Sequence, residues 1–234
     1  MKKKILCTIC MRGNSKGIIN KNLIKINGKP LLSYTIKTAI NSKLFDEIVV
    51  SSDSLKILEA SRKLHVKNLI KRPKKLATDF SGKIPAIRHA LIETERRLKK
   101  KFDFIMDLDV TSPLRSVKDV IKSFNQFIKV KAENLVSVTL SRKNPYFNIV
   151  ERRNSKIKLV KKSSYNILRR QDSPQTFDLN ASIYIWKRDI LLKKNNLFQN
   201  KTEIYEMSQN KSFDINNKTD LEITNLFLKK GNKL

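Results

Sequence analysis

Short apolar runs alternate with amphipathic segments along the first 140 residues, and this alternation limits the folds that are open to the chain. Runs typical of β-strands occupy residues 3–10, 45–53, 67–71, 101–110 and 134–140. Between them, apolar residues recur at helical spacing over residues 30–42, 54–64, 84–100 and 117–130. Strands that alternate with helices predict an α/β fold built on a mostly parallel, doubly wound sheet.

The pattern changes after residue 140. Residues 141–180 are basic and irregular, and the polar residues 153–155 between two short apolar runs predict a hairpin. A core strand resumes at 181–189, a short irregular segment follows, and a helix at 219–230 closes the sequence. We therefore expect a single domain over residues 1–234, with an arm inserted at about residues 141–180.

The chain is strongly basic: of its 234 residues, 50 are Lys or Arg and 21 are Asp or Glu, which gives a formal charge of +29. Such a charge favours an anionic partner, either nucleic acid or an anionic substrate. The basic residues recur along the whole chain, and helix-turn-helix, RNA-recognition and zinc-finger patterns are absent from the sequence. A basic nucleic-acid-binding protein is the alternative from another functional class, but we expect no nucleic-acid partner.

The first ten residues partly resemble a secretory signal, because three lysines precede an apolar run. That run meets Arg12 after residues 5–11, which is too short for a signal, and no small-residue cleavage site follows it. No later window approaches the ~18 consecutive apolar residues of a membrane span. We expect a cytoplasmic protein without membrane contact.

The two cysteines do not predict a disulfide or a zinc site. Cys7 and Cys10 fall on the first predicted strand, where residues three apart point to opposite faces and lie about 10 Å apart. A disulfide needs Cα atoms within about 7 Å. His65 and His89 are isolated in the sequence, so a zinc ion would lack further ligands.

Polar segments follow four of the predicted strands. They cover residues 12–22, 51–53, 72–83 and 107–115. In an open parallel sheet, ligands bind outside the carboxyl ends of the strands. These four loops are therefore expected to meet at one ligand-binding edge.

The first of these loops has the composition of a phosphate-binding loop. Gly13 and Gly17 permit close backbone approach, and Arg12, Ser15, Lys16 and Lys21 surround them with donors and positive charge. Its spacing matches neither the Walker A loop nor G-x-G-x-x-G. The loop indicates a triphosphate ligand without naming a nucleotide-binding family.

Two acidic segments are candidates for metal binding. Asp107 and Asp109 end a predicted strand two residues apart, so both point to the same face. Paired carboxylates beside a triphosphate loop suit Mg²⁺, which prefers oxygen ligands. A second segment places Asp214 and Asp220 shortly before the last helix.

Six ordered segments resemble the motifs of the acylneuraminate cytidylyltransferases, also called CMP-sialic acid synthetases. The segments are CTICMRGNSKGIINKNLIKINGKPLLSYTI, VVSSDS, KRPKKLATD, DLDVTSPLR, RRQDSPQTFDLNASIYIW and SFDINNKTDLE. The resemblance spans nearly the whole chain and is nearest to the branch that activates legionaminic acid. It implies a Rossmann-like nucleotide-diphospho-sugar transferase fold and a homodimer formed through the arm. The implied reaction is CTP plus a nine-carbon sugar acid giving CMP-sugar and pyrophosphate, with pseudaminic acid or Kdo as alternative acceptors.

The resemblance also assigns roles to individual residues. The nucleotide-binding residues would be Arg12, Ser15, Lys21, Asn22 and Arg72, and the sugar-binding residues Arg170, Gln171 and Asn180. The composition of the basic loop adds Gly13 and Lys16 to the nucleotide-binding residues, and Asp109, which departs from the family pattern, is expected near the sugar or the metal. Arg12, Lys21 and Asp214 would be catalytic, the two cations by stabilising charge on the phosphates.

The chain departs from the family at its metal motif. Asp214 matches the first aspartate of the family's Asp-Ile-Asp motif, whereas the second position is Asn216. An asparagine can ligate through its carbonyl oxygen but brings no charge and cannot act as a base. Asp109 stands where sialic-acid enzymes commonly have glutamine, so we expect Asp214 and Asp109 to hold Mg²⁺, with Asn216 peripheral. The general base is not identified, Asp214 being one candidate, and an inactive relative is the alternative that Asn216 leaves open.

Overall fold

The computed structural model describes residues 3–14 and 17–231, which contain a central sheet of seven strands. In order across the sheet these are β11 (Thr202–Glu206), β7 (Asn134–Leu140), β10 (Phe177–Lys187), β6 (Phe104–Leu108), β1 (Ile5–Cys10), β4 (Glu47–Ser52) and β5 (Asn68–Lys71). Strand β10 is antiparallel to both its neighbours, and all other pairs are parallel. This confirms the predicted α/β class and the mostly parallel sheet.

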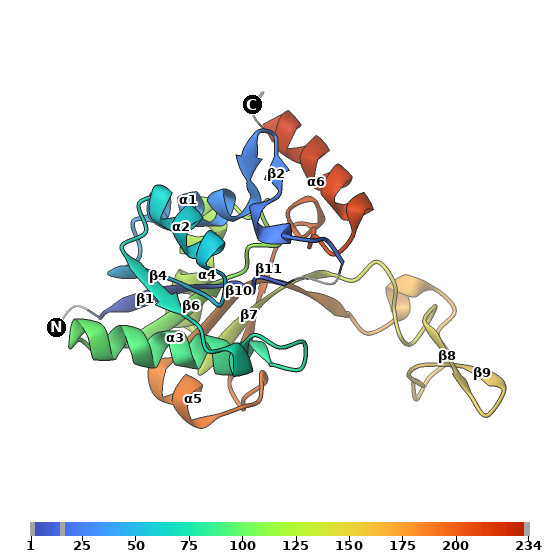
Figure 1. The fold of residues 1–234 in the computed structure, drawn as a ribbon. Coiled ribbons are helices and arrows are strands. Elements are labelled where there is room, and N and C mark those ends of the chain that lie inside the picture. Colours follow the sequence, from blue (N-terminus) through green and yellow to red (C-terminus); the bar gives the residue numbers. More distant parts are fainter. Residues whose placement is uncertain (1–2, 15–16, 232–234) are drawn as a thin grey trace.

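Helices cover both faces of the sheet (Figure 1). One face carries α1 (Leu31–Ser42), α2 (Leu55–Lys63), α4 (Val117–Lys129) and α6 (Lys218–Gly231), and the other carries α3 (Lys83–Leu98) and α5 (Arg188–Lys193). Alternate residues of β1 enter the two cores: Cys7 lies in the first, whereas Leu6 lies in the second and Cys10 packs against it. Both cysteines are free thiols on opposite faces, as the strand spacing predicted.

A capping box fixes the start of α4 and therefore the end of the loop that follows β6. The Ser116 hydroxyl accepts a hydrogen bond from the Asp119 backbone N–H at 3.2 Å, and the Asp119 carboxylate accepts one from the Ser116 N–H at 2.9 Å. Each partner satisfies a donor that a helix start would otherwise leave unpaired. The loop from Asp109 to Ser116 is thus anchored by the sheet at one end and by this cap at the other.

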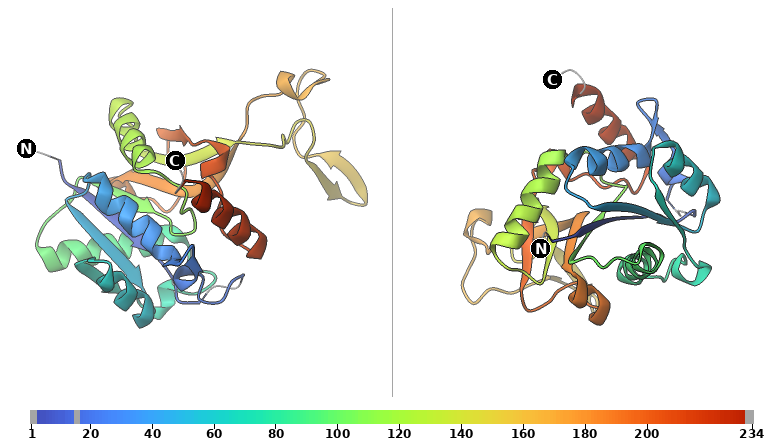
Figure 2. Two further views of the ribbon diagram at one scale, coloured as in Figure 1. Left: turned by 90° about the horizontal axis from the view of Figure 1, so that it is seen from above. Right: turned by 90° about the vertical axis from the view of Figure 1, so that its left-hand side faces the viewer.

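Residues 141–176 leave the body as an arm that ends in the hairpin of β8 (Val150–Arg153) and β9 (Lys156–Leu159) (Figures 1 and 2). Asn154 and Ser155 form its turn with positive φ angles of 46° and 61°, which suits a two-residue hairpin. The hairpin agrees with the sequence prediction. Strand β10 begins at Phe177, inside the range that we assigned to the arm, so residues 177–180 belong to the central sheet.

The segment that we expected to be irregular after residue 189 contains helix α5 and strand β11. Both elements are short, and β11 has no clear alternation of apolar and polar residues, so the periodicity did not reveal them. A small hairpin of β2 (Lys25–Ile26) and β3 (Lys29–Pro30) also interrupts the chain before α1. Within the described residues, no helix combines the length and apolar character that crossing a bilayer requires.

Candidate active site

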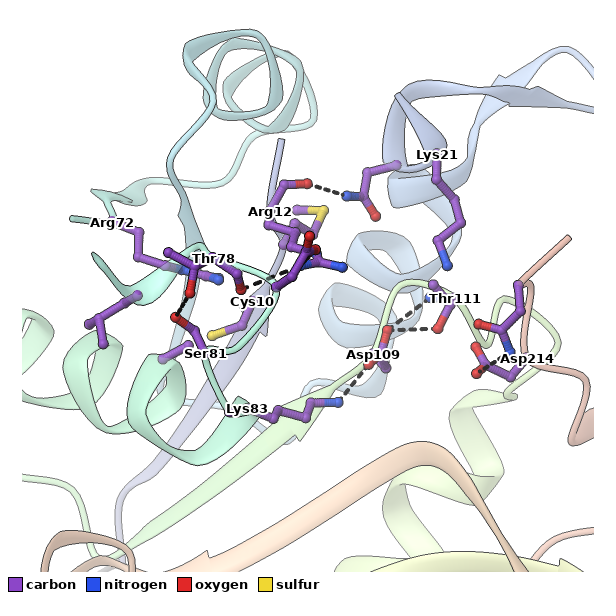
Figure 3. Close-up of a pocket in the computed structure, with 17 residues that line it drawn as sticks. Cys10, Arg12, Lys21, Arg72, Thr78, Ser81, Lys83, Asp109, Thr111 and Asp214 are labelled. Carbon is purple, nitrogen blue, oxygen red and sulfur yellow. Dashed lines mark hydrogen bonds and ion pairs between the residues drawn. The ribbon is translucent and has the colours of Figure 1, made fainter. Parts of the chain in front are cut away.

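A cavity of about 370 Å³ opens at the carboxyl ends of β1, β5 and β6 (Figure 3). Its lining includes Arg12, Lys21 and Asn22 after β1; Arg72, Thr78, Asp79 and Ser81 after β5; Lys83 at the start of α3; Asp109 and Thr111 after β6; and Asp214 and Asn216 before α6. Three of the four polar loops predicted to converge therefore line one cavity. The fourth loop, which follows β4, does not line the cavity but contacts the basic loop. There the Asp53 carboxylate accepts a hydrogen bond from the Gly13 N–H at 2.8 Å.

Arg12 and Lys21, the cations of the basic loop within the described residues, are held by acceptors of the protein. The Arg12 Nη1 lies 2.6 Å from the Asp79 Oδ1, and the Lys21 Nζ donates to the Ile215 carbonyl oxygen at 2.6 Å. Asn22 is buried and donates from Nδ2 to the Arg12 carbonyl oxygen at 2.9 Å, which fixes the start of the loop. The cations thus face the cavity with positions already set.

Two positions of this loop require glycine because other segments approach them closely. A Cβ atom at Gly17 would lie 2.2 Å from the Asn216 carbonyl oxygen, and one at Gly13 would lie 2.9 Å from the Ser54 Cβ. The absence of a side chain at Gly17 therefore lets the basic loop pack closely against the segment before α6. Ser15 and Lys16, which we assigned to the nucleotide, lie outside the described residues.

Arg72 forms the wall of the cavity at the end of β5. Its side chain is buried, and Nη2 donates to the Ser51 carbonyl oxygen at 2.8 Å. An arginine held in this way presents a fixed charge to a ligand.

The strand-end carboxylates share one lysine. The Lys83 Nζ lies 2.6 Å from the Asp109 Oδ2 and 3.2 Å from the Asp107 Oδ2, so both acids face the same side of β6, as predicted. Asp107 is fully buried and also accepts from the Thr8 hydroxyl at 2.7 Å. The second oxygen of Asp109 accepts from the Thr111 N–H and hydroxyl at 3.0 and 2.9 Å.

These contacts determine the charge states. Burial would raise the pKa of Asp109, but Lys83 and the Thr111 hydrogen bonds outweigh it and lower this pKa to about 2. Burial raises the pKa of Asp107, because Lys83 and Thr8 offset only part of the desolvation. Burial works against the charged form of Lys83, yet the two carboxylates raise its pKa overall. Asp109 is therefore a fixed negative charge and a poor proton acceptor.

A buried arginine, Arg115, organises the loop that carries Asp109. Its guanidinium donates to the Asp109 carbonyl oxygen at 3.2 Å, the Ser182 carbonyl oxygen at 2.8 Å and the Thr35 hydroxyl at 3.0 Å. These partners belong to the loop, to β10 and to α1. Arg115 thus serves the shape of the site and does not line the cavity.

The segment before α6 forms the opposite wall. The Asp214 Oδ2 accepts from the Asn216 Nδ2 at 3.0 Å, while the buried Asp214 Oδ1 has no hydrogen-bond partner among the described residues. A buried carboxylate oxygen without a donor is costly unless a cation satisfies it. This oxygen fits a Mg²⁺ ligand, although residues 3–14 and 17–231 contain no cluster of three His, Cys, Asp or Glu side chains suited to a metal.

Several residues assigned from the sequence lie away from this cavity. Arg170 and Gln171 lie on the arm, where the Arg170 Nη2 donates to the Ser141 carbonyl oxygen at 2.6 Å. Asn180 is buried at a bulge of β10, where its Oδ1 accepts from the Ser137 hydroxyl at 2.6 Å and its Nδ2 donates to the Ser212 hydroxyl at 3.0 Å. Its amide is thus already bonded within the chain.

The sequence reasoning gave no role to several polar residues that the structure brings to the cavity, among them Thr78, Asp79, Ser81, Lys83 and Thr111. The first four belong to the segment 72–83 that we expected at the ligand-binding edge, of which only Arg72 was given a role, and Lys83 begins α3. The sequence did contain a signal for these positions, because Asp79 and Lys83 stand in a segment that also carries Gly82.

Comparisons of the sequence identify the family. The profile described as cytidylyltransferase matches residues 6–232. The chain is 42% identical to post-translational flagellin modification protein B of Campylobacter coli, over 98% of this chain and 97% of that protein. It is 41% identical to the CMP-N,N'-diacetyllegionaminic acid synthase of Campylobacter jejuni, over 96% and 95%, and 30% identical to a pseudaminic acid cytidylyltransferase of the same species, over 97% of each.

Solved structures show the same fold. The CMP:2-keto-3-deoxy-manno-octonic acid synthetase complexed with CTP superposes with a TM-score of 0.70 at 15% identity, covering 98% of this chain and 100% of that one. A 4-diphosphocytidyl-2C-methyl-D-erythritol synthase gives 0.69 at 12% identity, covering 97% and 99%. The sheet of this protein is thus of the Rossmann-like nucleotidyltransferase type. With a family match over almost its whole length and a cationic cavity at the strand ends, the chain belongs to the cytidylyltransferase family and is a CTP-dependent nucleotidyltransferase.

Proposed function

We propose that this enzyme transfers the cytidylyl group of CTP to a nine-carbon sugar acid, giving CMP-sugar and pyrophosphate. One observation carries the proposal: a single cavity collects the cations Arg12, Lys21 and Arg72 together with the carboxylates Asp109 and Asp214. The cations suit the charge of a triphosphate, and carboxylate oxygens suit the Mg²⁺ that accompanies it.

The acceptor that we favour is a legionaminic acid. Support comes from the CMP-N,N'-diacetyllegionaminic acid synthase, which shares 41% of its residues with this chain across almost the full length of both. Pseudaminic acid is the second candidate, because two pseudaminic acid cytidylyltransferases share 29% and 30%. Kdo rests on a structural relative at 15% identity and is the weakest of the three.

In the proposed reaction, the anomeric hydroxyl oxygen of the sugar forms a bond to the α-phosphorus. The bond from this phosphorus to the bridging oxygen breaks, and pyrophosphate leaves. Such a transfer depends on positioning and charge neutralisation. Arg12 and Lys21 would exchange their present acceptors, the Asp79 carboxylate and the Ile215 carbonyl oxygen, for phosphate oxygens.

Asp214 and Asp109 would hold Mg²⁺, with Asn216 peripheral. The unpaired Asp214 Oδ1 supports this assignment, and Asp109 would contribute lone pairs that Lys83 and Thr111 leave free. Bound Mg²⁺ would neutralise phosphate charge. A pKa of about 2 makes Asp109 a poor base, so the candidate acceptors of the hydroxyl proton are water and, where it does not hold the metal, Asp214.

We further propose a homodimer formed through the arm. Val150 and Ile157 of its hairpin and Leu168 beyond it are exposed by 59%, 57% and 77%, and such apolar side chains favour a protein partner. Arg170 and Gln171 lie on the same arm, a placement that suits sugar-binding sites shared between two chains. The cytoplasmic location stays a prediction.

The proposal is tested by pyrophosphate release with CTP and Mg²⁺ in the presence of N,N'-diacetyllegionaminic, pseudaminic or N-acetylneuraminic acid, or Kdo. We expect the largest kcat/KM with the legionaminic acid. Omitting the sugar is the control for CTP hydrolysis. Release with pseudaminic acid alone would reassign the acceptor, and no release from a folded protein that binds CTP would refute the proposed reaction.

A further inference from the structure

We propose that Lys83, held in place by Asp107 and Asp109, is a specificity-determining residue that binds a hydroxyl group of the acceptor sugar. The inference rests on the proposed function. It adds Lys83 to the residues that bind the acceptor. It depends on the position of Lys83 at the start of α3, on its two carboxylate partners and on the cavities that it lines.

Local helix energetics do not explain a lysine at this position. Lys83 is the first residue of α3, where the helix dipole disfavours positive charge, and residues 83–86, Lys-Ile-Pro-Ala, contain no acid to offset it. The compensation comes from β6, through Asp107 and Asp109. Residues that contradict local preferences while being compensated from elsewhere are expected at functional sites.

The lysine retains capacity for a ligand. An ammonium group has three N–H donors, and the close carboxylate contacts of Lys83 account for two of them. Its Nζ also lies 4.4 Å from the centre of the Tyr184 ring. The side chain is nevertheless 29% exposed, so the remaining donor is accessible to a ligand.

Lys83 and Gly82 line two cavities. Besides the main cavity, they line a second one of about 260 Å³, whose walls include Ile84, Tyr184 and Trp186. The main cavity, at about 370 Å³, is at the lower end of the range for one ligand. If CTP occupies the main cavity, the acceptor extends toward the second, past Lys83.

The orientation of the side chain agrees with this arrangement. Figure 3 shows Lys83 turned toward Asp109 and away from Arg72. Within the cavity, Lys83 therefore points to the acidic wall at Asp109 and not to Arg72, one of the cations that we assign to the triphosphate.

The charge balance indicates which group of the acceptor binds here. The Lys83 ammonium already has two carboxylate partners in Asp107 and Asp109, so it does not need the carboxylate of a sugar acid to neutralise it. A hydroxyl group can accept from the remaining N–H of Lys83 without adding charge. The chemistry therefore favours a neutral hydroxyl of the acceptor.

The test measures the KM for the acceptor and, separately, CTP affinity by calorimetry without acceptor. We expect Lys83→Met to raise the KM of the preferred acceptor by about 10- to 100-fold, because a hydrogen bond to a charged group is lost. CTP affinity should change by less than about twofold. Lys83→Arg, which keeps the donor, should restore part of the loss.

Two control variants test whether losing any lysine of this loop would have the same effect. Lys74→Met removes an exposed lysine that does not line the cavity, and should leave the acceptor KM within about twofold. Lys75→Met changes an exposed lysine of the same loop and should have no effect. Thermal unfolding of each variant reports whether it folds.

Each outcome decides the inference. A selective rise in acceptor KM for Lys83→Met, with CTP affinity retained, supports it. An unchanged acceptor KM in an active enzyme would show that Lys83 only stabilises Asp107, and the proposed reaction would stand. Equal losses for CTP and acceptor would also overturn it. Wild-type protein that binds CTP but converts no acceptor would remove both the reaction and the inference.

Discussion

The two acidic walls of the cavity differ in how their charges are satisfied. At the end of β6, Asp109 has both oxygens occupied by Lys83 and Thr111 and is ionised over the physiological pH range. In the segment before α6, Asp214 has one oxygen paired with Asn216 and one buried oxygen without a donor among the described residues. Both oxygens of Asp109 therefore have partners within the protein, whereas one oxygen of Asp214 needs a cation to satisfy it.

This difference indicates a division of labour. A carboxylate that the protein already pairs is fixed in position, so Asp109 suits the orientation of Lys83 and the smaller share in holding the metal. A carboxylate left unpaired in a buried place suits a metal ion, whose binding recovers the cost of desolvation. Four variants test this contrast, from the largest expected effect to the smallest.

Asp214→Asn should have the largest effect, a fall in kcat/KM of at least about 100-fold, because the unpaired carboxylate oxygen is lost. Binding of Mn²⁺ in the presence of CTP, followed by electron paramagnetic resonance, should weaken in parallel. Asp109→Asn should weaken Mn²⁺ less, and the exposed Glu59→Gln should not change it. Equal effects at positions 214 and 109 would remove the contrast between the two walls.

Lys21→Ala should lower kcat by about 10- to 100-fold, because Lys21 would no longer neutralise phosphate charge. The fold should persist, since within the part of the chain that the structure describes the Lys21 Nζ donates a hydrogen bond only to the Ile215 carbonyl oxygen. Steady-state kinetics and thermal unfolding measure the two effects. The exposed Lys25→Ala, from the same region, is the control. Near-normal turnover of Lys21→Ala would refute the role of this lysine.

Asn216→Asp restores the second carboxylate of the metal motif and should lower the Mg²⁺ concentration for half-maximal activity by less than about tenfold, through added charge at the metal. Titration of activity with Mg²⁺ measures the shift. A higher Mg²⁺ requirement would mean that the amide of Asn216 is needed to hold Asp214.

Asp79→Asn should increase CTP affinity about two- to fivefold. Asp79 pairs with Arg12 at the cavity mouth, and an exposed ion pair of this kind contributes little to stability yet competes with phosphate for the cation. Calorimetry with CTP measures the change, and the exposed Glu206→Gln is the control. Weaker CTP binding would instead show that Asp79 positions Arg12 for the nucleotide.

The body of the fold could be predicted because its elements bury periodic apolar faces. Helix α3 occupies Lys83–Leu98 against a predicted 84–100, and its buried Ile87 and Leu91 show the spacing that identified it. Strand β11 has no such pattern, and its place beside β7 follows from tertiary packing. Its position at the sheet edge could not be read from local sequence.

The site was predicted in its segments but only partly in its contacts. The backbone rule that strand ends share one edge located Arg12, Lys21, Arg72 and Asp109 correctly. The bridge from Lys83 to β6 depends on how α3 packs across the sheet, which spacing does not encode. For Asn180, the positive φ of Ala181 beside it creates a bulge that directs the amide into hydrogen bonds within the chain.

Strand β10 gives the arm a mechanical connection to the site. The chain returns from the arm directly into the middle of the sheet, where Tyr184 pairs with Asp107 on one side and Val136 on the other. A force applied to the arm would therefore act along the backbone of β10, which is hydrogen-bonded to β6. Strand β6 carries Asp107 and leads directly to Asp109. Strand β10 therefore couples the arm to the strand that leads to the cavity. Removing residues 177–187 together with the arm would split the sheet in two.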